Sequence, residues 1–239
     1  MRASLILALL LAPAAAYNQG NRLYARKDYA GATLAYRQAL EAGPNALVHY
    51  NLGNALFKSG KIGEAILHYR RARFLDPRDA DIAANLAFAR SYRVDKVLTV
   101  PSPLARALDD AFHRLSFRES SLLAAACFLL AGLSLAAWVV WRWRLSLAVT
   151  PLLAALWLFC LVTRQAWSGE VGAAPGVVVT PEVSAASGPS EEAKQILLLH
   201  DGTEVRIREA RGDYLLVQLP GGTGGWIRKE AVERIYPRR

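Results

Sequence analysis

The residue types that most often carry chemistry are sparse in this sequence. Cys127 and Cys160 fall inside long apolar stretches, where they are either a redox pair or, as we favour, small residues of a packed helix interface. The four histidines, which lie without metal-ligand spacing, are His49, His68, His113 and His200. The sequence contains no phosphate-binding glycine loop, nucleophile elbow or paired acids. We therefore predict a binding protein that is not an enzyme and uses no cofactor or metal.

Residues that can bind a peptide recur near the N-terminus. Tyr17 and Asn21 return as Tyr50 and Asn54 after 33 residues, and Lys58 follows one helical turn after Asn54. An asparagine amide can hold a peptide backbone or a carboxylate, and the lysine adds a cation suited to an acidic segment. The other interpretation is that both asparagines only bond neighbouring helix ends.

The elements that position these residues are predicted to be helical repeats. The same offset aligns a second set of residues, Ala32, Tyr36, Ala39 and Pro44 with Ala65, Tyr69, Ala72 and Pro77. A period in this range is typical of a solenoid of helical pairs. The second copy, residues 46–79, resembles the tetratricopeptide repeat (TPR), with small residues where two helices approach, Gly60 in the turn and Pro77 after the second helix. The resemblance implies that the five positions above line a concave partner-binding groove.

The predicted array, residues 17–91, consists of two repeats and a capping helix from Asp81 to Arg90. The first repeat departs from the pattern at Gln19, and we expect its first helix to be short. About three repeats are usually needed to bury a continuous core. We therefore expect the array to lean on a partner, on a second copy of the chain or on the following segment.

Residues 1–16 have the features of a secretory signal peptide. Arg2 supplies the positive charge, the apolar region is too short to span a bilayer, and small residues end at Ala16. Cleavage there would make Tyr17 the mature N-terminus. The alternative is that residues 3–16 are an uncleaved anchor or the first helix of the array, because only Pro13 interrupts the run.

Residues 92–120 are predicted to be a juxtamembrane amphipathic linker. Ser102 and Pro103 mark a helix start. One side of that helix carries an apolar stripe, Leu104, Leu108, Phe112 and Leu115. The helix would lie on the membrane surface or fill the open end of the array. Ser116 and Glu119 form a capping box that starts the next helix.

Two uncharged stretches, residues 121–141 and 145–163, predict a transmembrane hairpin. Apolar residues of the first favour insertion by about 3–5 kcal/mol, with no charged residue to oppose it. Pro151 is expected to kink the second span. If the array is exported, two spans return the chain to the same side of the membrane. Arg142 and Arg144 would then lie in a cytoplasmic turn, as the positive-inside tendency favours.

Residues 164–175 are predicted to be a linker and residues 176–239 a small β-barrel. Short alternating runs are separated by turn residues at 201–202, 212–213 and 220–222. The segment resembles a bacterial SH3 domain, most specifically at Gly225-Trp226, and the resemblance implies that Tyr214 and Trp226 contact a partner. The Arg211-Gly212-Asp213 sequence is better explained as a hairpin turn than as an adhesion motif.

The order of these parts resembles the BatE-type proteins of the bacterial aerotolerance (Bat) operons. The fold class is therefore multidomain, with all-α TPR repeats, a two-helix transmembrane hairpin and a small all-β SH3-like barrel. The resemblance implies protein partners with von Willebrand A domains, another TPR protein and a MoxR-type AAA ATPase, with a role in stress or envelope integrity. We expect an inner-membrane interaction scaffold whose two soluble parts are periplasmic.

Other classes of function remain open. The SH3-like domain would bind peptidoglycan in one alternative, and the chain would recruit a wall hydrolase in another. The net charge of +9 also suits anionic lipid or an acidic protein. It does not point to nucleic acid, because the basic residues sit on helical repeats without a stripe of stacking aromatics.

Overall fold

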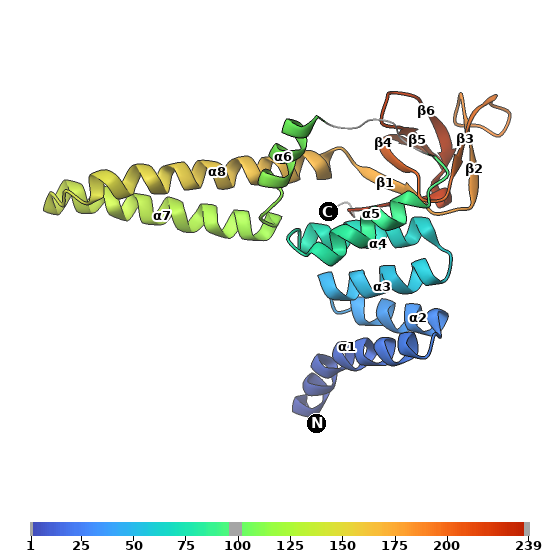
Figure 1. Cartoon of the computed structure of the whole chain (residues 1–239), viewed down its shortest axis with the longest axis horizontal. Coiled ribbons are helices and arrows are strands. Elements are labelled where there is room, and N and C mark those ends of the chain that lie inside the picture. The colour runs from blue at the N-terminus through green and yellow to red at the C-terminus, as the bar shows by residue number, and fades with distance from the viewer. Residues whose placement is uncertain (1, 96–101, 237–239) are drawn as a thin grey trace. The chain divides into compact units, whose positions relative to one another are not determined.

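The computed structural model describes residues 2–95 and 102–236, with side chains described from residue 13 onward. Residue 1 of the predicted signal segment, residues 96–101 of the predicted juxtamembrane linker and residues 237–239 of the predicted C-terminal domain lie outside these ranges. The chain divides into two compact units, Met1–Val100 with Ala173–Arg239, and Pro101–Gly172. The first contains a helical array and a C-terminal sheet, and the second contains the apolar helices (Figure 1).

The array is built from antiparallel helices that follow one another along the chain. They are α1 (Arg2–Ala25), α2 (Tyr29–Leu40), α3 (Ala46–Lys58), α4 (Ile62–Leu75) and α5 (Ala80–Ser91). Side-chain caps start three of them, because Asp28, Asn45 and Asp79 accept hydrogen bonds from backbone N–H groups of the first turn. Figure 1 shows the five helices stacked in sequence order.

The small residues predicted at the helix contacts are confirmed. Ala65 and Ala72 are completely buried, and a Cβ atom at Gly53 would lie 2.7 Å from Cε1 of Tyr69. Glycine is therefore needed for the tyrosine ring of α4 to lie against α3. Gly60 has a φ of 79° in the turn between these helices, a conformation that favours glycine.

Helix α1 differs from the expected short first helix. It runs without a break from Arg2 to Ala25, through the position after Ala16 where cleavage was predicted. A continuous helix of this kind is what the alternative predicts, in which residues 3–16 belong to the first helix of the array. Pro13 removes one backbone donor, and most other residues of the 3–16 run are alanine and leucine, which are good helix formers. Ala16 is 5% exposed in the array core, so the helix is packed at that point.

The C-terminal region is a seven-stranded antiparallel sheet. Its strands are β1 (Pro175–Val178), β2 (Glu182–Ala186), β3 (Gln195–His200), β4 (Glu204–Arg211), β5 (Tyr214–Gln218), β6 (Gly224–Arg228) and β7 (Val232–Arg234). They pair in the order β3-β2-β6-β5-β4-β1-β7. The predicted turns fall between strands, and Gly212 and Asp213 form the two-residue connection from β4 to β5. Among the described residues no ladder joins the edge strands β3 and β7, so the sheet is unclosed.

The sheet supplies the support that the short array lacks. Val177 of β1 and Ile235, which follows β7, are completely buried in one core with Ile66 of α4 and Leu86 of α5. The ring of Tyr236 packs on Phe74, with centroids 4.7 Å apart. The array therefore leans on the C-terminal sheet, a part of its own chain that lies far along the sequence.

The second unit is a hairpin of two long helices preceded by a short one. They are α6 (Pro103–Phe112), α7 (Phe117–Trp141) and α8 (Ser146–Gly172). The predicted starts are confirmed, because Ser102 caps α6 and Ser116 forms the capping box with Glu119 at the start of α7. Helices α7 and α8 are long and apolar enough to cross a membrane, and only 11% and 17% of their apolar windows are buried.

The predicted linker at 164–175 is wrong over most of its length, because α8 continues to Gly172. Residues 164–172 of the predicted linker contain no proline that would end the helix. Trp167 is 2% exposed, and its Nε1 donates a hydrogen bond to the carbonyl of Leu115 at 2.8 Å. This contact with the start of α7 holds the extra turns of α8 in helical form.

Candidate functional site

The predicted groove residues of the array form a hydrogen-bonded ladder between neighbouring repeats. In the second repeat, Tyr69 Oη donates to Asn54 Oδ1 at 2.7 Å. Asn85 Nδ2 of the next helix donates to the same oxygen at 2.9 Å and to Tyr50 Oη at 3.0 Å. These bonds tie α3, α4 and α5 together. Asn54 is therefore a structural residue as well as a candidate for partner binding.

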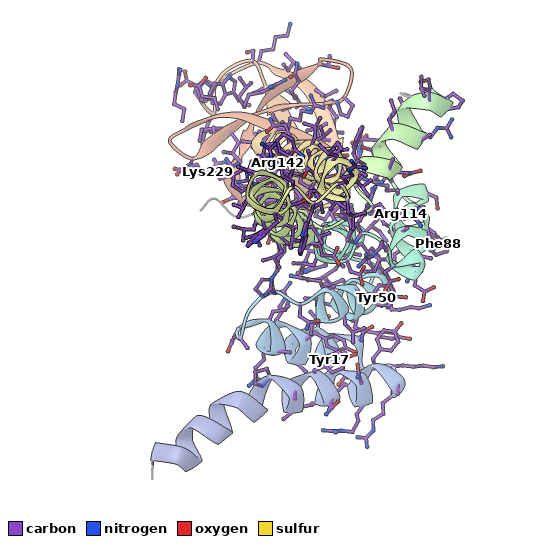
Figure 2. All side chains as sticks on the ribbon, turned by 90° about the vertical axis from the view of Figure 1, so that its left-hand side faces the viewer. Tyr17, Tyr50, Phe88, Arg114, Arg142 and Lys229 are labelled. Carbon is purple, nitrogen blue, oxygen red and sulfur yellow. The ribbon has the colours of Figure 1, made fainter. Side chains whose placement is uncertain are left out.

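The first repeat has the same ladder one level lower. Tyr36 Oη donates to Asn21 Oδ1 at 2.8 Å, and Asn51 Nδ2 donates to Tyr17 Oη at 2.9 Å. Burial raises the pKa of Tyr36 to about 12, so its hydroxyl stays protonated as a donor. Figure 2 shows Tyr17, Tyr50 and Phe88 following one another along the array.

The ladder leaves one polar group of each repeated asparagine available. In the described part of the chain Oδ1 of Asn21 and of Asn54 accepts hydrogen bonds, whereas no partner accepts from their Nδ2 groups. Both residues are only partly buried. An Nδ2 group that donates to a bound carbonyl would complete the hydrogen bonding of the amide. Lys58 is exposed one turn beyond Asn54.

An aromatic cluster on the same helices was not among the predicted site residues. Phe57, Phe88 and Tyr92 place their ring centroids 5.1–5.5 Å from one another. Phe88 is 53% exposed and Tyr92 57% exposed. The sequence contains a signal for this cluster. Asn85-Leu86 stand 34 residues after Asn51-Leu52, one residue more than the first offset, and at this spacing Phe88 occupies the place of Asn54 on α5. We call Phe57, Phe88 and Tyr92 the aromatic cluster.

Replacing Asn54 by alanine should reduce the stability of the array. The change removes the acceptor for Tyr69 Oη and Asn85 Nδ2, and the Tyr69 side chain is 2% exposed. Leaving a buried donor unpaired costs about 1–3 kcal/mol. Denaturant unfolding of the detergent-solubilised chain should show this loss. The control Asn18→Ala, at an exposed position of α1, should change stability by less than about 0.5 kcal/mol, and equal effects would contradict a structural role for the ladder.

The two residues predicted in the C-terminal domain line one groove. Tyr214 of β5 and Trp226 of β6 border a hollow of about 570 Å³ together with residues of β2, the 190–195 segment and the turn at 230–231. The guanidinium of Arg228 lies 5.7 Å from the Tyr214 ring, and that of Arg211 lies 5.4 Å from the Trp226 ring. Trp226 is 9% exposed, so most of its ring packs in the sheet, whereas Tyr214 is only partly buried.

A cluster of ion pairs joins the sheet to the array. Arg90 binds Glu204 of β4 through two hydrogen bonds of 2.7 and 2.8 Å, and Arg70 and Arg93 each reach the same carboxylate at 3.2 Å. Burial raises the pKa of Glu204, while the hydrogen bonds and charges of the three arginines lower it, and the net direction is down. Glu204 therefore remains charged and holds three cations of the array.

The turn after β3 contacts α4 of the array and the segment that follows α5. Asp201 Oδ2 accepts a hydrogen bond from the backbone N–H of Gly63 at 3.0 Å, and Lys61, which precedes α4, provides no side-chain cap. Asp201 therefore caps α4 from a distant part of the chain. Asp95 accepts from the backbone N–H of His200 at 2.9 Å and also bonds Thr203.

A buried histidine pair lies between α3 and α4. Nδ1 of His49 and Nδ1 of His68 are 3.0 Å apart, so one nitrogen donates and the other accepts. Burial, followed by the charge of Arg71, lowers the pKa of His49 to about 4. Burial, followed by the charges of His49, Arg71 and Arg37, lowers the pKa of His68. Both rings are therefore neutral near neutral pH.

The histidine pair predicts that acid weakens the array. Since the pKa of His49 is lower in the folded than in the unfolded chain, its stabilising contribution is complete above about pH 6.5 and is lost as the pH falls towards 4. Between pH 7.5 and pH 5 this amounts to about 2 kcal/mol. Denaturant unfolding at both pH values measures the loss. The double variant His49→Gln, His68→Gln should lose less between the two pH values, and an unchanged pH dependence would exclude the pair as its source.

The structure provides no metal site among the residues it describes, since no three potential ligands gather there. Cys127 and Cys160 are buried free thiols in α7 and α8, at 4% and 0% exposure. The other predicted site residues lie in two places. One is the first-helix face of the array, which α1, α3 and α5 form, and the other is the groove of the sheet.

Comparison with known proteins bears on the first of these places. A family model described as tetratricopeptide repeat matches residues 17–80. No curated protein matches the chain. The match covers α2, α3 and α4, with the part of α1 from residue 17 onward, and ends at the start of α5. Residues 17–80 are therefore similar to tetratricopeptide repeats, a fold that serves protein–protein interaction.

Proposed function

We propose that this chain is a membrane-anchored protein–protein interaction scaffold of the bacterial cell envelope. The observation that carries the proposal is the first-helix face of a TPR-like array, which presents the Nδ2 groups of Asn21 and Asn54, without an acceptor among the described residues, on the same face as an exposed aromatic cluster. Repeats of this kind typically serve protein–protein interaction. The order of domains supports a Bat-type aerotolerance or stress complex, with von Willebrand A-domain proteins and other Bat-type membrane proteins as partners.

The partner suited to this face is an extended peptide segment. Its backbone carbonyls would accept hydrogen bonds from Nδ2 of Asn21 and Asn54, which are donors spaced by one repeat. An apolar side chain would cover Phe88 and Tyr92, which expose about half of their surface. Lys58 would attract an acidic residue at one end. The ring edges of Tyr17 and Tyr50 would contact the peptide between these positions.

Site-specific photocrosslinking in native membranes tests this assignment. A benzoylphenylalanine placed at Phe88 should crosslink to a protein partner that mass spectrometry identifies. The same probe at Leu34, which is 70% exposed on α2, is the matched control and should give no such product. Adding Asn54→Asp keeps oxygen acceptors for Tyr69 and Asn85 but removes the Nδ2 donor, and should reduce the crosslink. A partner captured from position 34 and not from position 88 would move the binding site to the second helices.

In this proposal the hairpin of α7 and α8 anchors the chain in the bacterial inner membrane. Both soluble parts lie on the periplasmic side. The support for the anchor is the length and apolar composition of the two helices and their exposed leucines. The predicted signal peptide and an even number of spans set the orientation. Alkaline phosphatase fused after Arg239 should be active. Inactive enzyme in a well-expressed fusion would place the C-terminus in the cytoplasm.

The groove of the sheet favours a second candidate function. A hollow that contains Tyr214, Trp226 and charged groups on its rim suits a peptide with both apolar and ionic groups. In this candidate the SH3-like domain binds the peptides of peptidoglycan or recruits a wall hydrolase. Cosedimentation of the detergent-solubilised chain with purified peptidoglycan tests it, with Tyr214→Ala as the variant expected to lose binding. Retained binding by that variant would exclude the groove.

A further inference from the structure

Helix α6 carries an apolar stripe that the described residues of its own unit do not cover. Leu104 is 69% exposed and Leu108 48% exposed, one turn apart on the same side of the helix. Arg106 and Asp110 stand on the other side, and Asp109 lies at the flank of the stripe. Exposing two leucines to water is unfavourable, at about 25 cal/mol for each Å² of apolar surface. Separation of apolar from charged residues is one feature of helices that lie in the interface of a lipid bilayer.

Contacts within the second unit fix where this helix meets the hairpin. The ring of Phe112 at the end of α6 lies 6.0 Å from the ring of Phe159 on α8. His113 stacks edge-on against Trp167, with centroids 4.4 Å apart, and Trp167 is bonded to Leu115. Phe159 lies within the last two turns of the uncharged part of α8, which ends before Arg164. The end of α6 is therefore at the depth where the apolar run gives way to charge.

Cations surround the same level of the hairpin. Arg114, Arg118 and Arg164 are exposed near the α6–α7 connection, and the guanidinium of Arg164 lies 5.7 Å from the Phe117 ring. Beside it, a hollow of about 410 Å³ is lined by Leu161 and Val162 on its apolar part and by polar residues on the other. Figure 2 labels Arg114, which follows α6. An apolar surface bordered by arginines complements an acyl chain bordered by lipid phosphate.

We infer that α6 lies in the headgroup region of the leaflet at the base of the hairpin, with Leu104 and Leu108 directed into the acyl boundary. Arg114, Arg118 and Arg164 would bind the phosphate groups of phospholipids. The inference rests on the proposed membrane anchor and goes beyond it, because a hairpin can span the membrane whether or not α6 touches lipid. Its physical basis is continuity, since the apolar stripe of α6 joins the apolar surface of α8 at Phe112 and Phe159.

Spin labels in the full chain test this placement. In a Cys127→Ala, Cys160→Ala background, single variants Leu108→Cys and Asp110→Cys carry a nitroxide on opposite sides of α6. Leu133→Cys, at an exposed position midway along α7, reports on the hairpin. The chain is reconstituted into vesicles of phosphatidylethanolamine and phosphatidylglycerol. Collision rates with oxygen, which enters lipid, and with a nickel chelate, which stays in water, give the depth of each label.

The label at position 108 should favour oxygen over the nickel chelate several-fold more than the label at position 110. Equal, high collision with the chelate at 108 and 110, with position 133 buried in lipid, would overturn the inference and leave the anchor intact. Low collision with both reagents at 108 would show that protein covers the stripe, which also overturns it. Chelate access at position 133 would remove the anchor and with it the inference.

Discussion

Replacing Glu204 by glutamine should cost the array and sheet about 3 kcal/mol of stability. The amide keeps the shape of the side chain but removes a carboxylate that Arg70, Arg90 and Arg93 share. Three guanidinium groups with side chains 15–28% exposed would then repel one another. Removing one partner of a buried ion pair costs about 3–5 kcal/mol, and the partial exposure places this cluster at the lower end.

The measurement is denaturant unfolding of the full chain in detergent, with Glu209→Gln as the matched control. Glu209 lies on the same strand, pairs with Arg211 at 2.9 Å and is 47% exposed. An exposed pair of this kind contributes about 0–1 kcal/mol. Since the folded-state pKa of Glu204 is lowered, its contribution is present at neutral pH and is lost as the pH falls through that pKa. Equal losses for the two variants would mean that the arginine cluster does not hold the sheet to the array.

The local architecture of this protein follows from its sequence. The 33-residue offset predicts the helix pairs, because Gly53, Ala65 and Ala72 are small where helices meet. Serine at 102 and 116 predicts the starts of α6 and α7. Turn glycines predict the ends of the strands, and an uncharged run predicts each long helix. All of these signals act between residues close in the chain, where spacing and conformational preference decide the structure.

The contacts between distant segments had no such signal. Glu204 is 114 residues from Arg90, and Asp201 is 138 residues from Gly63. A single carboxylate in a strand is an ordinary surface residue until its three partners are known. The missing cap of α4 at Lys61 is a residue-level clue that another segment would supply one, but it does not say which. The sequence therefore predicts that the array needs support and leaves the identity of that support to tertiary structure.

The candidate site shows the same division. The repeat places Asn21 and Asn54 at equivalent positions, yet it cannot tell a ladder of hydrogen bonds from a ligand site. Their partners, Tyr36 and Tyr69, are also repeated, so a donor for each Oδ1 was present in the pattern. Phe88 breaks the repeat at the place of the third asparagine. A residue that departs from the repeat, at a position where helix packing does not require it, is a stronger signal of binding than a residue that follows the repeat.

We expect Trp226→Ala to lower the stability of the sheet by about 3–5 kcal/mol, the usual cost of removing a large aromatic side chain from a core. Trp226 is 9% exposed, pairs with Leu216 on β5 and meets Ala186 of β2, where the two halves of the sheet join. Its loss would leave a cavity at that junction, since neighbouring glycines at 224 and 225 carry no side chain to fill it.

Comparing variants of Tyr214 and Trp226 distinguishes a core role from a ligand-contact role for the residues of this groove. Tyr214 lies on the same groove but is only partly buried, so Tyr214→Ala should cost less than Trp226→Ala while removing the same ligand surface. Unfolding titrations and peptidoglycan cosedimentation of both variants give the two quantities independently. A loss below about 1 kcal/mol for Trp226→Ala, together with lost binding, would make the indole a contact residue whose ring the sheet does not need. Unchanged stability and unchanged binding in both variants would show that this groove is neither the core junction nor the ligand site of the domain.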